Sequence, residues 1–215
     1  MKKKLFIICV ISLLVLISCS TKKDTIINSG DFSDSDDTQV TISQSSLFDE
    51  NNKKLEPHLH LNSSCVKIDY KGEKKYIHVY LEIWENGEVK EKMGNFANLL
   101  DDSVFDGELS ISLKDIILDD GKISKTTLLT TSLSKKTGFC SSSKYIKRYP
   151  SDYAFSPYVY QEPFTTSDDE EISVIGLMAI DNSVNSYHQE DTIEATAKKA
   201  NWALVAKILF KDTID

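Results

Sequence analysis

The segment 145–164 holds the side chains of this chain that are best suited to bind a ligand. It contains seven aromatic residues and three of the four prolines. Because proline cannot donate a hydrogen bond to a neighbouring strand, we expect this segment to be a loop or an edge strand. Tyrosine rings on a stiffened segment offer flat apolar faces with hydroxyl tips, which both sugars and protein partners use.

The candidate binding surface comprises Arg148, Tyr149, Tyr153, Tyr158 and Tyr160. Arg148 is the only arginine of the chain, and a guanidinium is the group best shaped for two-point contact with a carboxylate or a phosphate. The alternative is that the rings cap an open end of the β structure. If the rings of Tyr153, Tyr158 and Tyr160 lie in the core, the hypothesis of a binding surface loses its basis.

Two further pairs of side chains suggest metal or redox chemistry. His58 and His60 lie two residues apart, so in an extended chain both imidazoles would point to one side. No third ligand lies nearby, and the pair predicts no metal site.

Cys65 and Cys140 could form a disulfide outside the cytoplasm. The closed loop of about 75 residues would stabilise the fold by roughly 4 kcal/mol.

Common catalytic motifs are absent from the sequence. It has no G-x-S-x-G, Walker loop, G-x-G-x-x-G, H-E-x-x-H or C-x-x-C motif. The spacing of the acidic residues singles out no carboxylate pair for glycoside hydrolysis. The sequence therefore predicts no catalytic residue and no cofactor, and it favours a protein that is not an enzyme.

The charge of the chain excludes one class of partner. The 33 acidic residues outnumber the 25 basic ones, which gives a net charge of −8. A nucleic-acid-binding protein needs a basic face, so we expect no nucleic-acid partner. Four cysteines in 215 residues are too few for a disulfide scaffold.

The first 18 residues have the pattern of a signal peptide. Three lysines at positions 2–4 precede an apolar run over 5–17, which is shorter than the about 20 residues that span a bilayer. The run ends in Leu16-Ile17-Ser18-Cys19. This segment resembles the lipobox of bacterial lipoprotein precursors, with a large aliphatic residue three positions before the cysteine and a small residue just before it.

The resemblance implies diacylglycerol transfer to the thiol of Cys19, cleavage after Ser18 and acylation of the new amino terminus with chains such as palmitate. Each buried methylene contributes about 0.8 kcal/mol, so two or three acyl chains form a stable anchor. Without Lys2, Lys3 and Lys4 the chain keeps 22 basic and 33 acidic residues, a net charge of −11. Anionic lipid headgroups repel such a domain, so the expected membrane contact is the covalent lipid.

Residues 19–54 are expected to form an acidic flexible tether. The stretch 31–50 contains six acidic residues and no Lys or Arg, and such a segment buries too little apolar surface to fold alone. A calcium site at Asp34, Asp36 and Asp37 is the alternative, but the Gly and closing Glu of an EF-hand loop are missing. A short strand over 39–43 is also compatible with the pattern.

Alternating apolar residues predict strands through most of the remaining chain. The clearest runs from 74 to 84, where Ile77, Val79, Leu81 and Ile83 share one face. It ends at Asn86-Gly87, a strong hairpin signal. Further strands are expected around 66–70, 88–93, 109–113, 126–133, 171–180 and 202–210, with a turn at 119–121 and a helix from Asp191 through Lys199.

These elements predict a mainly β protein, an antiparallel β-sandwich of about seven to nine strands with one short C-terminal helix. Residues 55–215 are expected to form a single β-rich extracytoplasmic domain. The leading functional hypothesis is a lipid-anchored binding or interaction module of the bacterial cell envelope, on the outer side of the cell membrane, with an envelope protein or a glycan as partner. The alternatives are a hydrolase of envelope polymers, which needs a cleft with close, pKa-shifted groups, and a purely structural or assembly lipoprotein, which needs no pocket.

Overall fold

A computed structural model of the protein describes residues 39–48, 50–181 and 188–214. The expected signal peptide and Cys19 lie outside the described residues. The described residues all belong to one compact unit.

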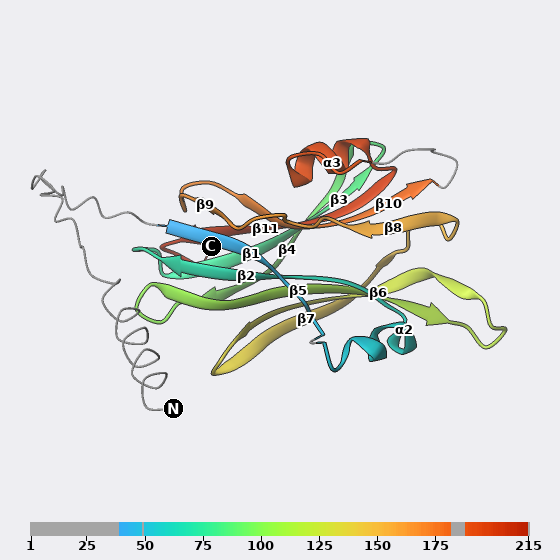
Figure 1. Cartoon of the computed structure of the whole chain (residues 1–215), viewed down its shortest axis with the longest axis horizontal. Coiled ribbons are helices and arrows are strands. Elements are labelled where there is room, and N and C mark those ends of the chain that lie inside the picture. The colour runs from blue at the N-terminus through green and yellow to red at the C-terminus, as the bar shows by residue number, and fades with distance from the viewer. Residues whose placement is uncertain (1–38, 49, 182–187, 215) are drawn as a thin grey trace, which may run out of the picture. The chain divides into compact units, whose positions relative to one another are not determined.

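Eleven strands in two antiparallel sheets make up most of the described residues (Figure 1). The six-stranded sheet has the order β7-β6-β5-β2-β1-β9. Its strands are β1 (Gln39–Ser45), β2 (Leu61–Lys71), β5 (Val104–Ile117), β6 (Ile123–Lys135), β7 (Gly138–Lys147) and β9 (Phe164–Thr166).

The five-stranded sheet has the order β4-β3-β11-β10-β8. Its strands are β3 (Tyr76–Glu85), β4 (Glu88–Leu99), β8 (Tyr153–Pro157), β10 (Ile172–Asp181) and β11 (Trp202–Lys211). The fold is therefore the expected mainly β antiparallel sandwich, with more strands than the seven to nine that the sequence predicts. The prediction contains no strand at β7 or β9, whereas β8 is the edge strand that the sequence allows, as the alternative to a loop, within 145–164.

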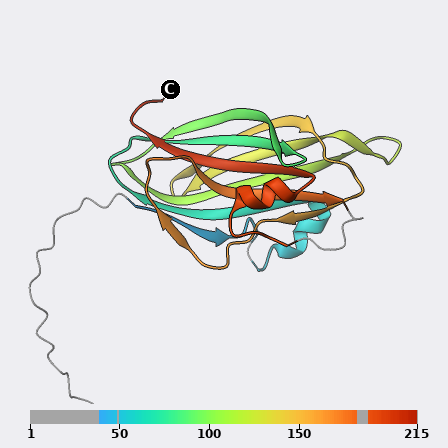
Figure 2. The ribbon, with the colours of Figure 1, turned by 90° about the horizontal axis from the view of Figure 1, so that it is seen from above.

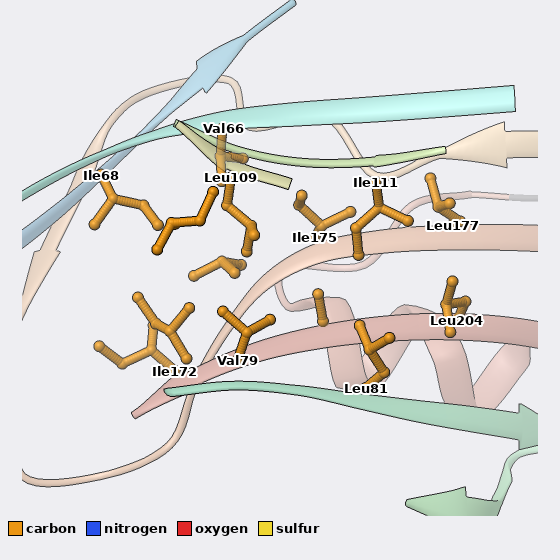
Figure 3. Packing of buried hydrophobic residues seen from close by; sticks show 14 of the residues in the cluster. Val66, Ile68, Val79, Leu81, Leu109, Ile111, Ile172, Ile175, Leu177 and Leu204 are labelled. Carbon is orange, nitrogen blue, oxygen red and sulfur yellow. The ribbon is translucent and has the colours of Figure 1, made fainter. Parts of the chain in front are cut away.

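The main core lies between the two sheets. Figure 3 shows Ile68 and Leu109 of the six-stranded sheet facing Val79 and Leu81 of the five-stranded sheet, and all four side chains are fully buried. Each such side chain contributes about 1.5–3 kcal/mol when it leaves water. Because side chains alternate along a strand, the period-two pattern of the sequence places this apolar set on one face of each sheet.

A second, smaller core lies on the outer face of the five-stranded sheet, where helix α3 (Ile193–Lys199) packs (Figures 1 and 2). Ile193 and Ala197 of the helix pack with Met178 of β10 and Val205 of β11. This sheet is thus buried on both faces, which explains why β10 and β11 are apolar at nearly every position. The N-cap is Thr192 and not Asp191, where the sequence predicts the start of the helix, because the hydroxyl of Thr192 accepts the hydrogen bond from the Ala195 amide.

The hairpin between β3 and β4 turns at the expected pair. Asn86 and Gly87 have φ values of 52° and 79°, which a type I′ turn requires. A Cβ atom at position 87 would lie 2.5 Å from the backbone oxygen of Lys198, so glycine also lets the end of α3 approach the turn.

The short strand that the sequence allows over 39–43 is present, so the tether expected over 19–54 is wrong in this part. Residues 39–45 form strand β1, which pairs with β2 on one side and β9 on the other. Val40 and Ile42 are fully buried, so this short alternation gains enough burial from tertiary contacts to fold. The folded domain therefore includes β1 and does not begin at residue 55. A 3-10 turn, η2 (Lys53–Leu55), and the short helix α2 (Glu56–Leu59) connect β1 to β2.

Candidate functional site

The predicted tyrosines lie against the core. Tyr149 and Tyr158 are buried, with 5% and 7% of their surface exposed, while Tyr153 and Tyr160 are half-buried and pack against the main core. Two of the four outer strands of the two sheets, β8 and β9, lie in or at the end of the proline-rich segment 145–164. The rings therefore close the sandwich at its edges, and the prediction that they form an exposed binding surface is wrong for Tyr149 and Tyr158.

The hydroxyl groups of three of these tyrosines are held by internal hydrogen bonds. Tyr149 accepts from Nδ2 of Asn62 at 2.9 Å. Tyr158 donates to the backbone oxygen of Asp191 at 2.9 Å, and Tyr160 donates to that of Ser173 at 3.0 Å. Burial raises the pKa of all three phenols, so the hydroxyls stay protonated and the rings are fixed in place.

Arg148 is engaged inside the protein. Its Nε lies 2.7 Å from Oδ1 of Asp115 and its Nη2 lies 3.0 Å from Oδ2, while Nη1 donates to the backbone oxygen of Tyr149. The side chain is only 8% exposed, and the guanidinium lies 4.7 Å from the centre of the Tyr149 ring. The expectation that Arg148 offers its guanidinium to a ligand is therefore wrong, because Asp115 already occupies its two-point face.

Two pockets nevertheless include the predicted residues, and they lie at opposite ends of β10. The basic pocket has a volume of about 740 Å³ and contains Arg148, Tyr149 and Tyr153. Four cationic side chains line it, but three are paired: Lys122 with Asp120, Lys147 with Glu85, and Arg148 with Asp115. The net attraction of this pocket for an anion is therefore weak.

The acidic pocket has a volume of about 770 Å³ and contains Tyr158 and Tyr160. Its walls come from three stretches of chain, within residues 158–167, 170–173 and 189–194. Six carboxylate side chains line it, and no Lys or Arg is among the described residues that do so. The six are Glu162, Glu170, Glu171, Glu190, Asp191 and Glu194.

Cations from outside the pocket neutralise only part of this charge. Lys199 pairs with Glu190. Lys207 lies below the pocket at 3.7 Å from Glu171 and 3.9 Å from Glu194, but it also pairs with the buried Glu82 at 3.4 Å. Within the described part of the chain, Glu162, Glu170 and Asp191 have no cationic partner. The pocket therefore keeps a negative field.

Cys65 and Cys140 are both free thiols. Cys65 lies on β2 and Cys140 on β7, and β5 and β6 lie between these strands. Neighbouring strands are about 4.8 Å apart, so the two Cα atoms lie well beyond bridging range. The candidate disulfide is therefore not formed in this fold. Burial raises the pKa of Cys65 to about 11, which keeps its thiol protonated.

The histidine pair does not have the extended geometry that places both rings on one side. His58 lies in α2, and His60 ends that helix with a left-handed φ of 53°. The described residues contain no group of three or more His, Cys, Asp or Glu side chains placed to hold a metal ion. No helix within the described ranges is long and apolar enough to cross a membrane.

Two features of the surface do not follow from the motifs and spacings of the sequence. One is the acidic pocket, although four consecutive acidic residues at 168–171 are a local signal for it. The other is the exposure of Phe139 and Tyr145, which keep 76% and 70% of their surface in solvent. Both rings project from the edge strand β7, where no neighbouring strand covers them.

Comparisons of the chain with family models, with curated proteins and with solved structures gave no match.

Proposed function

We propose that this protein is a lipid-anchored extracytoplasmic binding module of the bacterial cell envelope whose acidic pocket receives an organic cation, an amine with at least two positive charges. The observation that carries the proposal is the six-carboxylate lining of a cavity of about 770 Å³. Small-molecule sites occupy about 300–1,000 Å³, so the pocket has the size of a ligand site.

The charge of the pocket favours a ligand with more than one ammonium group. Two ions 4 Å apart attract by about 1 kcal/mol in bulk water and about 4 kcal/mol near a protein surface. Glu171 and Glu194 contact Lys207 only at 3.7 Å and 3.9 Å, so they retain capacity for a closer cation. A diamine or polyamine can contact these carboxylates and the unpaired Glu162 and Glu170 together.

The aromatic wall of the pocket supplies a second contact for the same ligand. Tyr158 and Tyr160 meet edge to face with ring centres 5.2 Å apart, and Phe164 lies 5.2 Å from Tyr160. Ring faces attract ammonium groups and pack against methylene chains. Because internal hydrogen bonds fix two of the rings, little side-chain entropy is lost when a ligand binds.

The other two hypotheses are less well supported. A hydrolase of the two-carboxylate type needs a carboxylic acid whose pKa is raised, whereas the carboxyl groups with shifted pKa values in the described residues, Glu82, Glu88, Asp106 and Asp120, all shift downward. The inward-packed tyrosines agree with a purely structural lipoprotein, but such a protein needs neither pocket.

Titration calorimetry of the full chain in a neutral detergent tests the ligand class. We expect spermidine to bind and an uncharged polyol of similar length not to bind, with the affinity falling as salt screens the carboxylates. Glu162→Gln combined with Glu170→Gln should weaken binding about thirtyfold, because each of the two lost attractions is of the order of 1 kcal/mol. The matched control is Glu91→Gln on β4. An unchanged affinity of the double variant for spermidine would contradict the proposal. A titration of the wild-type protein with spermidine that shows no heat of binding would contradict it as well.

The membrane anchor needs its own experiment because Cys19 lies outside the described residues. Cys19→Ala should leave the leader uncut or move the protein to the aqueous phase in detergent partitioning. If the variant partitions like the wild-type protein, the lipid is not the anchor. This result would not affect the ligand assignment.

A further inference from the structure

The outer face of the six-stranded sheet carries a regular grid of hydroxyl groups over β5, β6 and β7. Ser110, Ser132 and Ser141 lie side by side in register, and Ser112, Thr130 and Ser143 form the next row. Their neighbours in sequence, such as Leu109, Ile111 and Leu133, are buried in the core, so the alternation along each strand turns the hydroxyls outward.

Two exposed aromatic rings flank this grid along β7. Phe139 and Tyr145 lie on the same outward side of the strand as Ser141 and Ser143, with 76% and 70% of their surface exposed. They are the only aromatic rings among the large hydrophobic side chains exposed in the described part of the chain. Six residues of strand place them about 20 Å apart.

The centre of the grid carries no charge. More than a quarter of the chain is charged, at 27%, yet all six grid positions are Ser or Thr. Only Thr130 and Ser143 are hydrogen-bonded to each other, at 2.9 Å. Among the described residues, the hydroxyls of Ser110, Ser112, Ser132 and Ser141 have no side-chain partner, so they are free to bind a ligand. Helix α3 covers the other sheet, on the opposite side of the sandwich (Figure 1).

We propose that this face binds an uncharged, linear polysaccharide lying along β7. The apolar faces of sugar rings would stack on Phe139 and Tyr145, and sugar hydroxyls would exchange hydrogen bonds with the grid. The charge of the protein favours a neutral polysaccharide over an anionic one. No cationic side chain stands in the grid to hold a polyanion, and the net charge of −8 repels one. The grid on β5, β6 and β7 shares no residue with the acidic pocket, so polysaccharide binding does not depend on that pocket.

A second copy of the chain added to the open edge of β7 is the competing occupant. The inward side of β7 carries Ser142 and Lys144, both half-buried. A strand added beside them would cover the ammonium group of Lys144, and inward-pointing charges at a sheet edge oppose such pairing. The edge of β7 therefore disfavours pairing with a second copy of the chain, while the outer face of the sheet stays open to a glycan.

Affinity electrophoresis of the full chain in a neutral detergent tests the proposal. The native gels contain hydroxyethyl cellulose, dextran or galactomannan, and a gel without polysaccharide serves as reference. We expect retardation in at least one of these gels. Phe139→Ala and Tyr145→Ala should each weaken the apparent affinity about tenfold through the lost stacking and burial, while Tyr145→Phe should retain it.

Leu99→Ala is the matched control, since Leu99 is an apolar residue of β4 with 56% of its surface exposed. This variant should be retarded like the wild-type protein. Unretarded wild-type protein in every polysaccharide gel overturns the proposal. Retardation that neither Phe139→Ala nor Tyr145→Ala reduces overturns it as well. A dimer that is lost in Tyr145→Ala would assign the face to a second copy instead.

Discussion

The guanidinium of Arg148 and the carboxylate of Asp115 form a two-point ion pair that joins β5 to the end of β7 across the intervening β6. The side chains are only 8% and 18% exposed, so water screens this ion pair only weakly. Asp115→Asn should therefore leave a buried guanidinium without its counter-charge. A fully buried pair broken in this way costs about 3–5 kcal/mol, and we expect about 2 kcal/mol here because the pair keeps some contact with solvent. The measurement is urea-induced unfolding.

The control for this pair is Asp120→Asn, which breaks the exposed ion pair between Lys122 and Asp120. Exposed ion pairs contribute little to stability, so the urea concentration at the unfolding midpoint should equal that of the wild-type protein. Replacing both partners, Arg148→Met with Asp115→Leu, should recover part of the stability that Asp115→Asn loses. Equal midpoints for Asp115→Asn and Asp120→Asn would show that the buried pair adds nothing.

The structure shows why the sequence predicts the central strands well and the edges poorly. Long strands such as β5 and β6 bury every second residue over most of their length, so alternation alone identifies them. The short strands β8 and β9 have three to five residues and include or follow prolines, so their pattern resembles a loop. Only pairing with β10 and β1 makes them strands, and no local signal encodes that pairing.

The candidate site was harder to predict for a similar reason. Ring type and proline content identify a rigid aromatic segment, but they do not say whether a ring faces water. Tyr149 is buried because it packs 5.3 Å from Trp202, more than fifty residues away in the chain. The acidic pocket likewise combines 170–173 with 189–194, which come together only when α3 packs on its sheet.

Gly107 of β5 tests the close packing of the six-stranded sheet. A Cβ atom there would lie 2.2 Å from the backbone oxygen of Ser134 and 2.7 Å from Cζ of Phe105. The oxygen belongs to the neighbouring strand β6 and cannot move without disturbing the ladder. Gly107→Ala should therefore destabilise the protein by about 1–3 kcal/mol, as overpacked cores do.

Gly94→Ala on β4 is the comparison for this substitution. A Cβ atom at position 94 meets no atom within 4 Å. Alanine also restricts the unfolded chain, so the variant should be as stable as the wild-type protein or up to about 1 kcal/mol more stable. Thermal unfolding separates the two cases, and a similar melting temperature for both variants would refute the packing argument.

The buried Glu82 should make the fold sensitive to acid. Burial alone would raise the pKa of Glu82, but its ion pairs with Lys92 at 2.7 Å and Lys207 at 3.4 Å outweigh this, and the pKa lies below its ordinary value of 4.5. The unfolded chain therefore takes up the proton first as the pH falls. The stabilisation is fully present above about pH 5 and is lost progressively as the pH falls toward the folded-state pKa.

Chemical unfolding from about pH 7 down to about pH 3 measures this dependence. Glu82→Gln should lower stability at neutral pH, since Lys207 loses its buried partner. As the pH falls, the variant should lose less of its remaining stability than the wild-type protein loses. Glu91→Gln removes an exposed carboxylate on β4, and this variant should keep the wild-type dependence of the free energy of unfolding on pH. Parallel curves for the wild-type protein and Glu82→Gln would exclude Glu82 as a source of the acid sensitivity.

The two thiols should react at different rates because their surroundings differ. Cys65 is 2% exposed and burial raises its pKa to about 11, whereas Cys140 is half-buried on the edge strand β7. The thiolate is the reactive form, so a maleimide should label Cys140 in the native protein and reach Cys65 only after denaturation. Peptide mapping by mass spectrometry assigns the label. In the native protein, Cys140→Ser should leave the peptide that contains Cys65 unlabelled, while Cys65→Ser should keep the label on Cys140. A peptide containing Cys65 joined to Cys140, or equal native labelling of both, would contradict the separation of β2 from β7 by two strands.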